Sequence, residues 1–253
     1  MVQVFRKLIS LIEFELRLAL EDKVVFLYTL MFPAAYFLVM SWNDFAAGRT
    51  TSNTDMVNNL FGFWSYIMIV GVLNQITITM FQMRENNFLK MYTFISGDKR
   101  LIYYANLIPQ MVILQIEVAL FDLLAIIIYR PSTRVLSLIG VCWLLNFVLI
   151  PIISFFTSII LVLPIKSKTL TIYLTGYIFA TLSLGAVYFK SPVLNTMVTI
   201  INPVDFQQNT YSLFAYQPHI VFIVLLLTIV GVAYIILGNV IISKMSLASR
   251  TNR

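Results

Sequence analysis

Charged residues, cysteine and histidine are scarce in this sequence of 253 residues. Only 11% of the residues are charged, and the chain has one cysteine, Cys142, and one histidine, His219. Disordered chains combine low hydrophobicity with high charge, so this composition excludes disorder, and a lone cysteine excludes a disulfide scaffold. One cysteine and one histidine also supply no metal cluster and no nucleophile–histidine catalytic site. We therefore expect neither a bound metal nor an enzyme.

A phosphate-binding loop of the form Gly-x-x-x-x-Gly-Lys-Ser/Thr is absent as well. That loop holds the phosphates of ATP through its backbone N–H groups and its lysine. We expect no directly bound cofactor, so any energy from ATP, with its Mg²⁺, would have to enter through a partner protein.

Apolar residues, in contrast, make up 60% of the chain, and the mean hydropathy is +0.89. A helix needs about 20 apolar residues to cross the hydrocarbon core of a bilayer. These values predict an all-α polytopic membrane protein in which residues 1–253 form a single transmembrane domain. Six apolar runs fit transmembrane helices, namely 24–42, 60–83, 105–129, 135–163, 169–189 and 219–242.

The positions of the basic residues predict the orientation of these spans. Six spans place both termini on one side, and if that side is the cytoplasm, 13 of the 17 Lys and Arg residues are inside. The positive-inside rule favours this arrangement, so we interpret the net charge of +6 as membrane topology and expect no nucleic-acid partner. The basic residues left outside are Arg49, Arg130, Arg134 and Lys190.

Two segments outside the spans are also apolar. Residues 1–22 separate charged from apolar side chains on a helical wheel, which predicts an amphipathic helix in the plane of the membrane interface, or alternatively a helix packed on another protein. Residues 190–218 are too apolar for an aqueous loop and too short to cross. They predict a re-entrant hairpin between the fifth and sixth spans.

Polar side chains within the spans mark faces that should avoid lipid. Gln75 and Thr79 share one face of the second span, which either packs against protein or lines a path. Tyr173 and Gly176 belong to a face of small and hydroxylated residues on the fifth span, where helices can approach closely.

The third span carries two acids, Glu117 and Asp122. A charge at the bilayer centre is costly, so each acid should face the bundle interior, lie near the interface or be protonated. Asp122 is close enough to the outer end to pair with Arg130 or Arg134. The two acids are about 140° apart on one helix, which argues against a paired-acid catalytic site.

The predicted cytoplasmic loop 84–103 has an apolar stripe. Phe88, Met91, Tyr92 and Ile95 follow helical spacing, and Ser96-Gly97 can end such a helix. An exposed apolar stripe calls for a protein partner, although it could instead lie on lipid headgroups.

Taken together, these features resemble a known family. The features are an N-terminal interfacial helix, a first span containing Pro33 (MFPAAYF), a loop that begins with Glu85 and ends in Ser96-Gly97-Asp98-Lys99-Arg100, and a hairpin before the last span. The chain resembles the membrane (permease) subunit of type-2 ATP-binding-cassette (ABC) exporters, in the bacterial peptide and drug export branch. Many relatives have Gly-Thr-Leu after the loop glutamate, where this chain has Asn86-Asn87-Phe88-Leu89.

The resemblance implies a set of site residues. The loop after the second span would be a coupling helix that docks on a separate ABC ATPase through Glu85, Phe88, Met91, Tyr92 and Ile95. Two permease subunits, identical or different, would pair with two ATPase copies in the lipid bilayer. The second and fifth spans would line the translocation path, with Gln75, Thr79, Tyr173 and Gly176.

The function implied is export of an amphipathic substrate, such as a peptide, lipid or hydrophobic drug, across the cytoplasmic membrane of a bacterium. Three alternatives remain open: an ion-coupled carrier that uses Glu117 and Asp122, a polysaccharide or lipid-glycan ABC exporter, and a membrane scaffold or immunity factor that transports nothing. Glycan export ranks lower because residues 16–28 lack the Arg-Tyr and Leu-Gly-Trp runs of those exporters.

Overall fold

The computed structural model describes residues 9–17, 23–48, 52–163, 167–187, 189–216 and 220–247. These residues form helices and no strands, which confirms the all-helical prediction. The first two helical regions are residues 9–17 and α2 (Lys23–Ala46). The remaining elements are α3 (Asn53–Gly71), η1 (Val72–Ile78), α4 (Thr79–Glu85), α5 (Phe88–Ser96), α6 (Lys99–Tyr129), α7 (Thr133–Thr157), η2 (Ser158–Val162), α8 (Ser167–Gly185), α9 (Pro192–Ile201), α10 (Pro203–Tyr216) and α11 (Ile220–Lys244).

Four helical stretches among the described residues are long and apolar enough to cross a membrane. They are Asn53–Glu85, Lys99–Tyr129, Thr133–Val162 and Ile223–Lys244, and each overlaps a span predicted from the sequence. The other two predicted spans coincide with α2 and α8, which are also helical. The chain is therefore a helical protein with the composition of a membrane protein.

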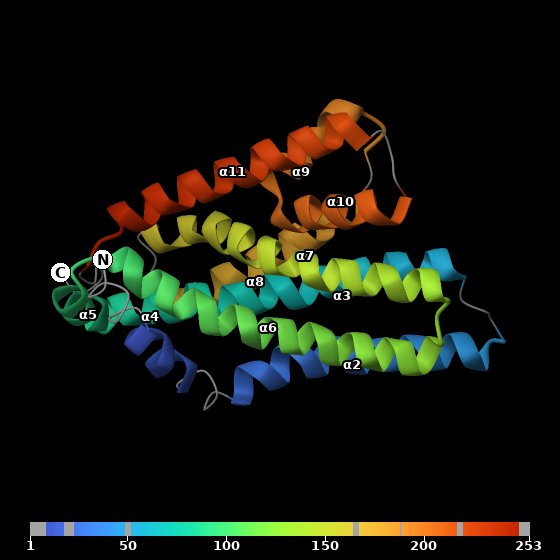
Figure 1. Cartoon of the computed structure of the whole chain (residues 1–253), viewed down its shortest axis with the longest axis horizontal. Coiled ribbons are helices and arrows are strands. Elements are labelled where there is room, and N and C mark those ends of the chain that lie inside the picture. Colours follow the sequence, from blue (N-terminus) through green and yellow to red (C-terminus); the bar gives the residue numbers. More distant parts are fainter. Residues whose placement is uncertain are drawn as a thin grey trace.

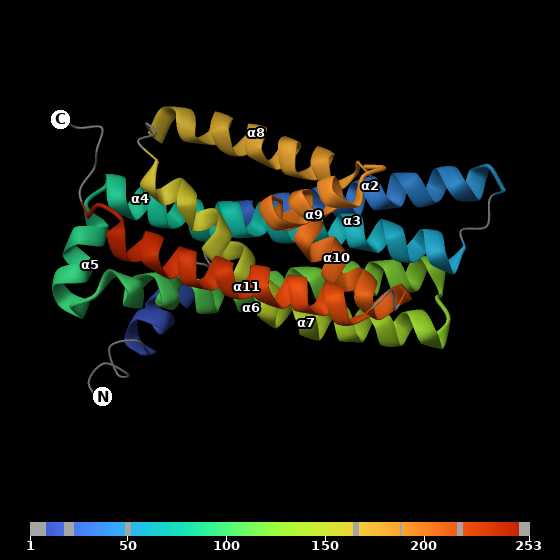
Figure 2. The ribbon, with the colours of Figure 1, turned by 90° about the horizontal axis from the view of Figure 1, so that it is seen from above.

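The helices form an elongated bundle with α5 at one end (Figure 1). α7 packs against α6 and α11, and α3 packs against α2 and α10. The helix 9–17 and the last residues of α11 lie at the same end as α5 (Figures 1 and 2). Both described ends of the chain are thus found beside α5, while the α6–α7 turn is at the opposite end.

The helix boundaries follow local chemistry. Ser52 caps α3 by accepting a hydrogen bond from the backbone N–H of Asp55 (3.1 Å), and Asp98 caps α6 by accepting from that of Arg100 (2.9 Å). At the N-terminus of α7 the side chain of Ser132 makes no such bond.

The stretch from α3 to α4 is continuous, but its middle seven residues, η1, are a π-helix. Wider π-turns inside an α-helix are rare and often occur at functional sites.

Residues 190–218, the predicted re-entrant segment, contain two short helices, α9 and α10, that meet at Asn202. The side chain of Asn202 is buried, donates to the carbonyl of Thr181 in α8 (2.9 Å) and accepts from the N–H of Val204 (3.1 Å). Pro203 follows at the start of α10, where its fixed φ suits a helix start. This junction fastens the pair of helices to α8.

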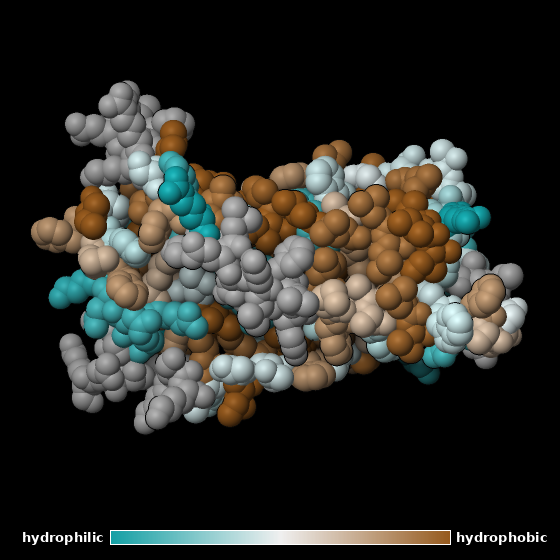
Figure 3. Space-filling view, turned by 90° about the horizontal axis from the view of Figure 1, so that it is seen from below, coloured by the Kyte–Doolittle hydropathy of each residue, from teal (hydrophilic) through white to brown (hydrophobic). Residues whose placement is uncertain are grey.

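Aromatic packing fills the centre of the bundle. Phe37 of α2 lies edge-on to Phe121 of α6, with ring centroids 5.3 Å apart, and edge-on to Phe63 of α3 at 5.5 Å. Outside this core, the visible face in Figure 3 has its largest hydrophobic area right of the middle, with hydrophilic residues at the end where α5 lies and pale to hydrophilic residues at the opposite end. An apolar surface between polar ends is the pattern expected of a bundle surrounded by lipid.

Candidate functional site

The short helix α5 is the first candidate site, and its ends are set by two residues with left-handed backbones. Asn87, before the helix, has φ 62°, and Gly97, after it, has φ 88°. Asparagine and glycine adopt this conformation most easily, so the chain can turn sharply into and out of α5. Leu89 is fully buried and anchors the helix to the bundle.

The opposite side of α5 is apolar and exposed. Phe94 is 93% exposed, and Phe88, Met91 and Ile95 are about half exposed or more. Met91, Phe94 and Ile95 line a surface hollow of about 710 Å³ together with Leu247, which follows α11. We call these five residues the α5 surface.

The structure changes the membership of the predicted stripe in two ways. Phe94 is its most exposed residue, although the prediction omitted it. A second stripe counted from Asn87 (87, 90, 91, 94) could have found it. Tyr92 instead faces the helix 9–17, where its ring meets that of Phe14 edge-on with centroids 6.1 Å apart.

The helix 9–17 is fastened to the bundle next to α5. Glu15 is buried and accepts a hydrogen bond from the side-chain amide of Asn106 in α6 (3.2 Å). Burial raises the pKa of Glu15, and the Asn106 bond partly offsets that rise. The pKa of Tyr92 is also raised, first by burial and then by the nearby Glu15 charge. Glu15 and Tyr92 thus join this helix to both α5 and α6.

Glu85, a predicted docking residue, is turned inward. Its carboxylate accepts from Nε of Arg84 at 2.9 Å, and its side chain is only 8% exposed. Arg84 is itself buried, donates to the carbonyl of Leu161 in η2 and lies 4.4 Å over the ring of Phe81. The pair therefore ties the end of α4 to the end of α7. In the sequence, the signal for this role is the pair of adjacent opposite charges, Arg84 and Glu85, that follows a long apolar run.

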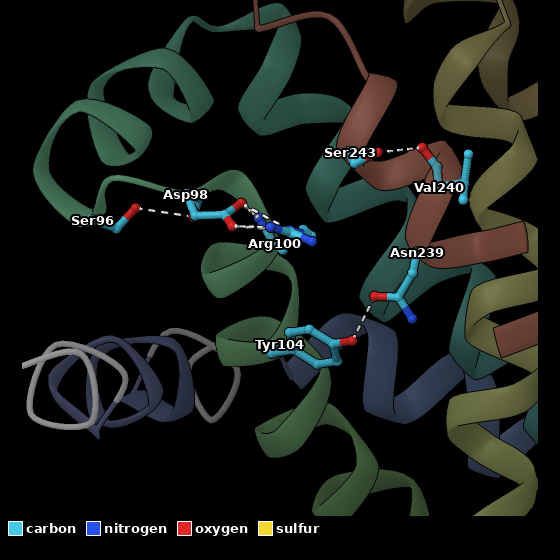
Figure 4. Close-up of polar contacts among 7 residues, drawn as sticks. All are labelled: Ser96, Asp98, Arg100, Tyr104, Asn239, Val240 and Ser243. Carbon is cyan, nitrogen blue, oxygen red and sulfur yellow. Dashed lines mark hydrogen bonds and ion pairs between the residues drawn. The ribbon is translucent and has the colours of Figure 1, made fainter. Parts of the chain in front are cut away.

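The loop from α5 to α6 is fixed by polar contacts (Figure 4). Ser96 donates to the carbonyl of Asp98 (3.2 Å), and the Asp98 carboxylate pairs with the Arg100 guanidinium (2.8 Å). Hydrogen bonding to Arg100 holds the pKa of Asp98 below its usual value. One turn later, Tyr104 donates to Asn239 of α11 (2.7 Å). The base of α5 is thus connected to both α6 and α11.

A second candidate site is a buried polar cluster around the π-helix. Glu117 is fully buried and accepts hydrogen bonds from the amide of Gln75 in η1 (3.0 Å) and from Thr29 in α2. Thr77, also in η1, shares a hydrogen bond with Thr157 of α7 (3.2 Å). Residues 75 and 77 are two positions apart on the helix and therefore face two different helices. Glu117 therefore faces the bundle interior, one of the three environments expected for it.

Asp122 is also inside the bundle, but the prediction that it pairs with Arg130 or Arg134 is wrong. Its carboxylate accepts from the indole N–H of Trp64 at 2.6 Å, and within the described part of the chain it forms no ion pair with Arg130 or Arg134. Asp122 is buried against α3, whereas Arg130 is exposed and follows the end of α6 with a left-handed backbone (φ 44°).

The polar network continues from Asp122 toward α10. The Trp64 ring lies edge-on to that of Tyr211 (5.2 Å), and the Tyr211 hydroxyl donates to Asn146 of α7 (2.5 Å) and accepts from Gln207 (2.6 Å). Trp64, Asn146, Gln207 and Tyr211 are site residues that sequence patterns did not reveal.

The predicted path residues do not come together within one chain. Gln75 is buried against Glu117, and Thr79 is partly buried on the same stretch of helix. Tyr173 is 61% exposed, and Gly176 has no neighbouring atom within 4 Å of the position a Cβ would take. α8 contacts the rest of the molecule mainly through α10 and α3 and lies at the edge of the bundle (Figure 2). The face of α8 that carries Tyr173 and Gly176 is therefore exposed in the described part of the chain.

In the described ranges, no group of three or more His, Cys, Asp or Glu residues could hold a metal ion. The arrangement offers an exposed apolar surface on α5 and buried hydrogen bonds around η1. No protein-family model, curated protein or solved structure matches the chain.

Proposed function

We propose that this chain is the permease subunit of an ATP-driven exporter and that α5 is the helix that docks on a separate ATPase subunit. The observation that supports this most strongly is the α5 surface. Four of its residues are large apolar side chains on one nine-residue helix, and Phe94 is almost fully exposed. Exposed apolar clusters of this kind are typical of protein contact sites.

The surroundings of α5 suit it to transmit a movement. The helix lies between two membrane-length stretches, Asn53–Glu85 and Lys99–Tyr129. Arg84 joins the first stretch to η2, and Tyr104 joins the second to α11. A partner that displaced α5 would therefore act on α3, α6, α7 and α11 together, through contacts that are rigid because they are buried or hydrogen-bonded.

In this proposal α2 and α8 are the first and fifth of six spans, and α5 and both chain ends face the cytoplasm. The positions of the described ends beside α5 support an even number of crossings. α9 and α10 form the outer hairpin. A second permease subunit would cover the exposed face of α8 and complete the path with Tyr173 and Gly176.

An ion-coupled carrier is the second candidate, and the burial of Glu117 favours it. One carboxylate oxygen of Glu117, Oε2, has no hydrogen-bond partner within the described part of the chain. A buried acid of this kind inside a membrane bundle is a common proton site. Transport that stops with an uncoupler and needs no ATPase would favour this candidate.

The direct test is Phe94→Ser. The chain is co-expressed with the ATPases encoded by its neighbouring genes, extracted in mild detergent and purified, and the amount of bound ATPase is measured on a sizing column. We expect at least a tenfold loss, because an exposed aromatic anchor contributes about 2 kcal/mol or more to such a contact.

The matched control is Phe94→Leu, which keeps the position apolar and should retain the ATPase. The variant Phe94→Ser should unfold at the same temperature as the parent, since the side chain is 93% exposed. Equal ATPase binding by the parent and Phe94→Ser would contradict the docking role.

A further inference from the structure

A pocket of about 440 Å³ lies at the end of the bundle opposite α5. It is formed by the first turn of α3, the first turns of α7 and the last residues of α10. Tyr216 of α10 donates to the side chain of Asn58 in α3 (2.7 Å), which holds these two elements together at the pocket. In Figure 1 all three elements reach the right-hand end of the molecule.

One side of the pocket is basic and hydroxylated. Arg134 lines it, is exposed and makes no hydrogen bond or ion pair with any other described residue. Ser132 and Ser137 add hydroxyl groups, and Ser132 is not used to cap α7. The nearest acid on the adjoining turn of α3, Asp55, does not line the pocket, because its carboxylate is bonded to the Ser52 hydroxyl (2.7 Å).

The other side of the pocket is apolar. Leu138 and Val141 continue along α7 from Arg134, and Phe214 faces them from α10. The sequence along α7 therefore passes from a cation to aliphatic side chains within two turns. A ligand that fits must carry an anionic group at one end and an apolar group at the other.

The position of the pocket identifies the source of such a ligand. The membrane-length stretches Asn53–Glu85 and Thr133–Val162 both begin at the pocket. The start of a transmembrane helix lies at the level of the lipid headgroups, where phosphates are abundant. A guanidinium is the side chain best suited to phosphate, because its fork can donate two parallel hydrogen bonds.

We propose that this pocket binds an anionic membrane phospholipid, with the headgroup phosphate on Arg134 and the Ser132 and Ser137 hydroxyls, and with the glycerol and upper acyl carbons against Leu138 and Val141. The lipid explains why Arg134, which has no partner among the described residues, lies at the end of the bundle where the charge rule predicts few cations. The inference rests on the membrane placement in the proposed function and not on the ATPase.

The test measures lipid retention by the full chain in a neutral detergent. Native mass spectrometry counts the lipids bound after titration with a phosphatidylglycerol or with a phosphatidylcholine of the same acyl chains. Both lipids carry the phosphate, but the choline cation of phosphatidylcholine cancels its charge and is repelled by Arg134. We therefore expect the phosphatidylglycerol to bind at least tenfold more tightly, and Arg134→Gln to remove most of this preference. Loss of one charge-assisted phosphate contact corresponds to about a tenfold change.

Arg130→Gln is the matched control, because Arg130 is four residues away, has the same charge and does not line the pocket. It should leave lipid binding unchanged. If the two variants lose lipid binding equally, binding depends on the overall positive charge and not on this pocket, which would overturn the site. Equal binding of the two lipids would overturn it too, as would displacement of the lipid by millimolar inorganic phosphate. The assay contains no ATPase, so its outcome is independent of the docking test.

Discussion

Asp122 and Trp64 form a buried hydrogen bond between α6 and α3, 2.6 Å from indole nitrogen to carboxylate oxygen. We predict that Trp64→Phe lowers the stability of the bundle by about 1 to 3 kcal/mol, because a buried acceptor then loses its donor. Asp122→Asn should cost less, since the amide oxygen can still accept. Thermal unfolding of the purified chain in detergent measures both changes.

A double variant supplies the control for this pair. In Trp64→Phe with Asp122→Leu, neither partner is left unsatisfied, so the loss should be smaller than the sum of the losses in Trp64→Phe alone and Asp122→Leu alone. Strict additivity of the two changes would contradict a direct interaction between these side chains.

For individual residues, the sequence predicted burial better than it predicted hydrogen-bond partners. Glu117 and Asp122 were expected to avoid lipid, and both are buried, because hydropathy alone makes a lipid-exposed acid unfavourable. Their partners are Gln75, which is 42 residues away, and Trp64, which is 58 residues away. Such pairs depend on how whole helices pack and rotate, which is not encoded in local spacing.

Among the helices, α7 and α11 make the most extensive contact, and Gly238 allows it. A Cβ at Gly238 would lie 2.7 Å from the carbonyl oxygen and 2.8 Å from the Cα of Phe155, so backbone atoms would have to move. We predict that Gly238→Ala destabilises the chain by about 1 to 3 kcal/mol, measured as a lower unfolding temperature.

Gly62→Ala is the comparison for this variant, because no atom lies within 4 Å of the position its Cβ would take. There the change should be neutral or stabilising, since alanine favours a helix. If both alanine variants behave alike, the close approach of α7 and α11 is not a determinant of stability.

The helices themselves were largely predictable, whereas their irregularities were not. Apolar runs located all the long helices, because a helix in lipid must be both apolar and about 20 residues long. The π-helix over Val72–Ile78 has no local signature in the sequence. Gln75 and Thr77 in this stretch have partners on two different helices, which is a property of the packed bundle.

For the molecule as a whole, the two ends of the bundle differ in chemistry. One end carries α5, the helix 9–17 and the last residues of α11, and the other carries the Arg134 pocket. The buried polar cluster lies between them and connects η1 to α2, α6 and α7. The proposal assigns the first end to a cytoplasmic protein partner and the second to lipid.

The most direct test of this account is the sidedness of Phe94. Cys142 is the only cysteine and is buried, so Cys142→Ala gives a background without thiols. One probe in this background is Phe94→Cys, and the other is Phe45→Cys, at the exposed C-terminal end of α2. We predict that a membrane-impermeant maleimide labels the Phe94 position only in inside-out vesicles and the Phe45 position only in intact cells. Bound ATPase should protect the Phe94 position alone. In samples without bound ATPase, labelling at the Phe94 position from outside the cell, or no labelling from either side, would contradict the account.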